Sequence, residues 1–176
     1  APVALALYLL WVRGVAIKPH LGLESKKWRT DVLRGLLVAA AIGIPGIALY
    51  LGARATGLAS KVIANDLQQY WWTIPVLILA ALKAALLEEV LVLGYLTDSL
   101  MRLGVRPRVS LAITSVLRGS YHLYQGFAGL VGNFVMGLAF AWLFERWRAK
   151  NPNGSALPFV IAHFLLDAFV FVGYSL

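Results

Sequence analysis

The chain has 176 residues, of which 60% are hydrophobic and only 14% charged. Soluble domains carry about 25% charged residues, and a soluble core of this length would leave large apolar patches exposed to water. This composition excludes an ordinary soluble protein, a disordered chain and a nucleic-acid-binding module. It predicts an integral membrane protein that contacts lipid and no nucleic acid. The chain has no cysteine, so disulfides and thiolate metal sites are also excluded.

Six apolar runs approach the roughly 20 residues that a membrane-spanning helix needs. In chain order they cover 1–17, 32–53, 72–97, 109–125, 127–145 and 157–175. The expected fold is therefore all-α, a polytopic transmembrane bundle with about six spans. The first run is short and has no basic leader, so it is a poor signal peptide. We expect it to be the remainder of a longer N-terminal region.

Basic residues gather in alternate loops between these runs. The loops after the first, third and fifth runs contain 11 of the 16 lysines and arginines, whereas the opposite loops offer only Arg54 and Lys61. By the positive-inside rule the three basic loops face the cytoplasm. The distribution of charge thus indicates a multi-pass membrane protein.

Three of the expected spans contain ionisable residues away from their ends. These are Glu88 and Glu89, Arg118 and His122, and His163 and Asp167. A charge at the centre of a bilayer costs about 2.5–3.5 kcal/mol on insertion scales, so such residues need a reason to be there. If the three helices face one another, the six side chains meet in one polar cavity.

The spacing of these residues adds detail. His163 and Asp167 are four residues apart, so they share a helix face and the carboxylate can orient the imidazole. Glu88 and Glu89 differ by about 100° around a helix, so one points into the cavity while the other flanks it. A carboxylate with two imidazoles nearby suits the activation of water and the stabilisation of an oxyanion. The alternatives are structural: a polar clasp between helices, or an interhelical hydrogen bond made by a histidine.

The order of an acid pair, a histidine and a final His-x-x-x-Asp resembles the CPBP family. This family contains the CAAX prenyl endopeptidases and the bacteriocin-processing or self-immunity proteins, also called Abi. Its pattern of EExxxR, FxxxH and HxxxN/D is matched here by EEVLVLG, RGSYH and HFLLD, and the first two segments look most like the actinobacterial branch. The resemblance implies an intramembrane protease of the bacterial cytoplasmic membrane. It divides the chain into N-terminal helices at 1–71 and a four-helix catalytic core at 72–176.

The resemblance also implies roles for the residues. Glu88 would be the base that activates water, with Glu89 as its partner. His122 and His163 would stabilise the developing charge. Asp167 accepts hydrogen bonds when ionised, so it would orient His163. The substrate would be a membrane-associated peptide or protein.

Two positions depart from the family pattern. The arginine expected four residues after the second glutamate is Leu93, and the phenylalanine expected four before the first histidine is Arg118. We expect Arg118 to supply the missing cation from the neighbouring helix. If it does not, the site would be poorly poised for catalysis.

The need for a cofactor stays open at this point. The glutamate mechanism requires none, but glutamate and histidine are also Zn²⁺ ligands, and a zinc ion would be held by Glu88, His122 and His163. The main alternative function is a catalytically inactive scaffold or immunity protein that binds a partner through the same cavity. A small transporter with a proton relay is a further alternative, but it predicts an inverted repeat that the sequence lacks.

Overall fold

The computed structural model describes residues 28–56, 70–150 and 155–173, with a few positions among the first fourteen. All regular secondary structure in these ranges is helical, which confirms the all-α prediction. The α-helices are α3 (Trp28–Ala55), α4 (Thr73–Glu88), α5 (Thr97–Arg102), α6 (Pro107–Tyr121), α7 (Phe127–Lys150) and α8 (Leu157–Gly173). A π-helix, η1 (Glu89–Leu96), joins α4 directly to α5, and a short 3₁₀ turn, η2 (Leu123–Gln125), lies between α6 and α7.

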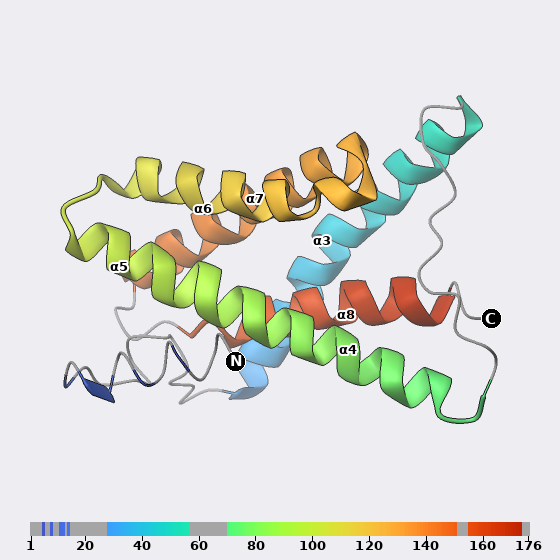
Figure 1. The fold of residues 1–176 in the computed structure, drawn as a ribbon, viewed down its shortest axis with the longest axis horizontal. Helices are drawn as coiled ribbons and strands as arrows, with labels where there is room; N and C mark the ends of the chain where they lie inside the picture. The colour runs from blue at the N-terminus through green and yellow to red at the C-terminus, as the bar shows by residue number, and fades with distance from the viewer. Residues whose placement is uncertain are drawn as a thin grey trace.

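The α3 helix runs obliquely to α4, α6 and α8 (Figure 1). The α6 and α7 helices form an antiparallel pair, and α8 lies against both α3 and α4. The chain from α4 through η1 to α5 runs the length of the bundle. Consequently the α4–η1 segment, α6 and α8 are packed in one assembly, and the ionisable residues lie on these elements or, for His122, directly after α6.

Proline and glycine mark several helix boundaries. Pro107 is the first residue of α6, and Pro158 lies in the first turn of α8, where a missing backbone N–H costs nothing. Gly104 and Gly126 have φ values of 84° and 86°, a left-handed conformation that glycine adopts without strain. They stand in the turns before α6 and α7, and so they set where both helices begin.

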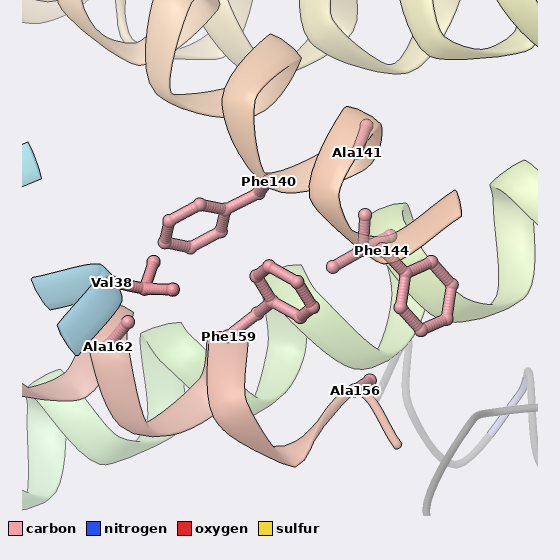
Figure 2. Packing of buried hydrophobic residues seen from close by; sticks show 8 residues of the cluster. Val38, Phe140, Ala141, Phe144, Ala156, Phe159 and Ala162 are labelled. Atoms are coloured by element: carbon pink, nitrogen blue, oxygen red, sulfur yellow. The ribbon is translucent and has the colours of Figure 1, made fainter. Parts of the chain in front are cut away.

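The hydrophobic core lies where α7 and α8 meet α3 and η1. Phe140 and Phe144 of α7 point toward Phe159 of α8, with Val38 of α3 beside them (Figure 2). The ring of Phe159 lies 5.2 Å from that of Phe140 and 5.9 Å from that of Phe144, in the tilted and edge-on arrangements that aromatic rings prefer. Leu93 of η1 belongs to the same cluster. This core therefore fixes the η1 segment against the α7–α8 pair.

The prediction of six membrane spans is only partly supported. Within the described residues, two helices are long and apolar enough to cross a bilayer, Trp28–Gly52 and Phe127–Lys150. The α6 and α8 helices, with 15 and 17 residues, fall short of the roughly 20 that a full span needs. The run expected at 1–17 lies mostly outside the described residues. The structure thus fits membrane insertion without establishing six crossings.

Candidate active site

The acid pair stands where α4 changes into the π-helix η1. Glu88 is the last residue of α4, and Glu89 is the first of η1. Glu89 is fully buried, whereas Glu88 is 8% exposed and lies at the edge of the interior. One carboxylate therefore faces inward while the other flanks it. π-Helical turns inside α-helices are frequently found at functional sites.

Arg118 of α6 joins the two carboxylates. Its Nη1 lies 2.7 Å from Glu89 Oε1, and its Nη2 lies 3.4 Å from Glu88 Oε2. The side chain is 2% exposed, and its guanidinium stands 5.3 Å from the centre of the Phe140 ring. A Cβ on Gly137 would lie 3.1 Å from Arg118 Cδ, so this glycine of α7 gives the arginine its room. A buried cation thus faces a buried acid pair.

His163 of α8 completes the inner part of the site. Its Nδ1 lies 2.8 Å from Glu89 Oε1 and 3.0 Å from Arg118 Nη2, and its Nε2 lies 3.3 Å from Asp167 Oδ2. Two acceptors without a proton between them do not approach to 2.8 Å, so the contact between His163 and Glu89 must hold a proton. The imidazole therefore has partners at both of its nitrogens.

His122 lies on the other side of the acid pair, directly after α6 ends. Its Nδ1 is 3.0 Å from the carbonyl oxygen of Arg118, and a carbonyl can only accept, so Nδ1 carries the hydrogen. In the neutral ring Nε2 is then an acceptor, and it faces Glu88 Oε1 at 3.9 Å. This distance exceeds a hydrogen bond and leaves the Glu88–His122 contact open to a bridging water.

Straight helices would put the two histidines at different depths, roughly 12 Å apart at 1.5 Å per residue. In the structure each histidine has its own carboxylate: His163 contacts Glu89, and His122 contacts Glu88. Arg118 spans the distance between these two pairs. All six candidate side chains are therefore brought into one connected cluster, even though the histidines do not contact each other.

The alternative zinc ligand set is not gathered. Within the described ranges, no three side chains among histidine, aspartate and glutamate are arranged to hold a metal ion. Glu89 faces a guanidinium, and the two imidazoles turn to different carboxylates. The residues present therefore do not fit a bound zinc ion.

Sequence reasoning missed Tyr121, the last residue of α6. Its phenol interacts with the Glu88 carboxylate and lies within electrostatic reach of Arg118. Its ring centre lies 4.8 Å from that of His122. The sequence does place Tyr121 near the site, because Arg118 and Tyr121 are three residues apart and so share one helix face. Tyrosine, however, is common near membrane interfaces, so its position alone did not indicate a site.

The family model for Rce1-like proteins, described as type II CAAX prenyl endopeptidase Rce1-like, matches residues 70–169. The match covers more than half of the chain. The chain belongs to the Rce1-like family. This confirms the CPBP resemblance inferred from the three motifs, and with it a membrane protein of a hydrolase family whose members are generally proteases. No curated protein and no solved structure matches the chain.

The Rce1-like match contains every candidate site residue, from the acid pair at the junction of α4 and η1 to Asp167 on α8. It begins just before α4 and ends within α8, so α3 lies outside it. The family model and the polar cluster therefore coincide in the same part of the chain.

Proposed function

We propose that this Rce1-like chain is an intramembrane endopeptidase that hydrolyses a peptide bond with water activated by Glu88. The observation that carries the proposal is the unequal environment of the two glutamates. Glu89 is fully buried against Arg118 and His163, whereas Glu88 lies at the edge and faces the acceptor nitrogen of His122. This difference supports Glu88 as the carboxylate that meets water and substrate.

The reaction begins with a water held between Glu88 Oε1 and His122 Nε2. Both atoms accept hydrogen bonds, so they orient the two protons of the water and leave an oxygen lone pair toward the substrate. Glu88 takes one proton as the water oxygen adds to the peptide carbonyl. The tetrahedral oxyanion then collapses, and the protonated Glu88 gives its proton to the leaving amine. Water is consumed, and a carboxylic acid and an amine are formed.

The inner residues position this base. Arg118 contacts both glutamates, so it holds the Glu88 side chain and offsets the charge of Glu89. His163 contacts Glu89 on one side and Asp167 on the other, which supports the orienting role proposed for Asp167. In this proposal Glu88 is the base, and its position depends on four inner residues: Glu89, Arg118, His163 and Asp167. A donor role for His122 would require a protonated ring.

The substrate is a membrane-associated peptide or protein, cleaved by the core at 72–176 in a multi-pass protein of the bacterial cytoplasmic membrane. The description of the family as CAAX prenyl endopeptidases supports a substrate that reaches the site from the lipid phase. The apolar exterior of α3 and α7 also supports a site that lies within the lipid bilayer.

The test is a cleavage assay with the chain reconstituted in liposomes. Two probe sets are used, a prenylated CAAX peptide and a mixture of unlipidated transmembrane peptides, with products read by mass spectrometry. We expect the wild type to cleave at least one set, with and without a chelator, and E88Q to lose cleavage while it stays folded. The control is E145Q, because Glu145 lies near Asp98 and Arg148 and away from the acid pair.

The same assay addresses the alternative of an inactive scaffold. The ion pair between Arg118 and the glutamates would also stabilise a purely structural polar core. A scaffold tolerates E88Q, because the amide keeps the shape of the side chain, whereas a general base does not. Cleavage that survives E88Q would overturn the assignment of Glu88. Absence of cleavage from both probe sets would favour the scaffold.

A further inference from the structure

Tyr121 stands at the accessible edge of the polar cluster. It is the last residue of α6, it is 38% exposed, and its phenol interacts with Glu88. Its ring lies against His122 at 4.8 Å between centres, with the planes 41° apart. The hydroxyl is thus close to the Glu88–His122 contact, where the proposed water would attack.

Hydrolysis at this place produces an oxyanion, which needs a nearby N–H or O–H donor. The inner donors are paired or closed off from a substrate: Arg118 is 2% exposed, and its Nε, which has no hydrogen-bond partner among the described residues, is buried. The terminal nitrogens of Arg118 face Glu88, Glu89 and His163. His163 is 2% exposed and has partners at both nitrogens.

The remaining side chains are also poor donors. His122 gives its Nδ1 hydrogen to the carbonyl of Arg118, so its neutral Nε2 can only accept. Asp167 lies 3.3 Å from His163 Nε2 and accepts there when ionised. A tyrosine hydroxyl, in contrast, keeps a donor hydrogen at neutral pH. Tyr121 carries such a donor at the exposed edge of the site, where its hydroxyl meets the Glu88 carboxylate.

We propose that Tyr121 is a further catalytic residue, whose hydroxyl donates a hydrogen bond to the tetrahedral oxyanion. This inference rests on the proposed function of Glu88 as general base. Before the reaction the phenol interacts with the Glu88 carboxylate. When Glu88 takes the proton from water, its negative charge is lost and the new negative charge stands on the substrate oxygen. The hydroxyl turns to that oxygen, and no proton is transferred from the tyrosine.

The test compares Y121F with Y124F in the liposome assay, using whichever probe set the wild type cleaves. Tyr124 is a matched control: its ring also lies near His122, at 6.2 Å between centres, but its hydroxyl accepts from Gln125 and the residue is 81% exposed. Loss of one oxyanion donor lowers kcat by about 10²–10³-fold. We expect that loss for Y121F with little change in KM or melting temperature, and near wild-type kinetics for Y124F.

The outcomes separate the two proposals. If the wild type cleaves, E88Q does not and Y121F keeps the wild-type kcat, the role of Tyr121 is overturned while that of Glu88 stands. A rise in KM alone would place Tyr121 in substrate binding and would also overturn the donor role. If cleavage survives E88Q, or if the wild type cleaves neither probe set, the proposed function fails and the role of Tyr121 fails with it.

Discussion

Arg118 Nη1 lies 2.7 Å from Glu89 Oε1, although 29 residues separate the two in the chain. Both side chains are almost completely inaccessible, at 2% and 0% exposure. In a low-dielectric interior, each charge would be strongly unfavourable without the other. The same guanidinium also contacts Glu88 and His163. Arg118 is therefore the side chain through which the inner and outer parts of the site are connected.

Replacing Arg118 with leucine is expected to destabilise the fold and abolish cleavage. R118L leaves a buried carboxylate without its cation, and breaking a buried ion pair in this way costs about 3–5 kcal/mol. The measurement is the melting temperature in detergent, together with the liposome assay. R118K is the control for charge: a single ammonium lacks the planar fork that contacts both glutamates, so we expect intermediate stability and low activity. Unchanged stability and activity in R118L would refute the role of Arg118.

A double substitution tests whether the cation can return to the position that the family pattern predicts. Leu93 and Arg118 line the same small cavity, so a guanidinium that starts at 93 would enter the space beside the one that the Arg118 side chain leaves. We expect R118L/L93R to recover part of the melting temperature and activity lost in R118L. The single variant L93R is the control and should be destabilised, because it adds a second buried cation. If the double variant recovers neither, the arginine at 118 does not replace the arginine that the family pattern expects at 93.

Asp167 is expected to act as a hydrogen-bond acceptor and not as an essential charge. Its Oδ2 lies 3.3 Å from His163 Nε2, and an asparagine oxygen can accept in the same place. D167N should therefore lose about tenfold in kcat, equivalent to about 1.4 kcal/mol, whereas D167A should lose considerably more. The measurement is kcat in liposomes for both variants. Equal loss in both would mean that the charge of Asp167 is required.

The sequence was sufficient to predict the helices and the residues that gather among them. Apolar runs predicted the ranges of α3, of α4 and η1 taken together, and of α6, α7 and α8 to within about five residues, because helix length and proline placement are local properties. The cost of charges in lipid indicated that the six ionisable residues face a common interior. Their actual contacts follow from tertiary packing.

Those contacts could not be predicted, for identifiable physical reasons. Helical wheels assume 3.6 residues per turn, and the π-helix at Glu89–Leu96 departs from that period just where the acid pair lies. The position of Arg118 depends on Gly137, a residue on another helix whose missing side chain makes space. The acceptor state of His122 Nε2 depends on the carbonyl of Arg118, which is available because α6 ends at Tyr121. Each of these features is a property of the packed bundle.

A second ion cluster is expected to contribute to stability but not to the chemistry. Asp98 of α5 is 6% exposed and lies 2.6 Å from Arg102 Nε and 3.3 Å from Arg148 Nη1 of α7. D98N removes the carboxylate that links α5 to α7, so we expect a lower melting temperature in detergent and an unchanged kcat. R102Q is the control, because its side chain is 64% exposed and such pairs contribute about 0–1 kcal/mol. A large loss of kcat in D98N without loss of stability would contradict this structural role.

The contact between α3 and α8 is expected to depend on Gly35. A Cβ at this position would lie 2.7 Å from Ile161 Cγ2 and 2.9 Å from the carbonyl oxygen of Pro158, and the backbone atom cannot move aside. G35A should therefore push α3 away from α8 and lower the melting temperature, measured by thermal unfolding in detergent. Gly46, in the same helix, has nothing within 4 Å of an added Cβ, so G46A is a matched control. Alanine favours a helix over glycine by about 0.5–1 kcal/mol, so G46A should be neutral or slightly stabilising. Equal melting temperatures for the two variants would show that α3 does not pack closely on α8, the helix that carries His163.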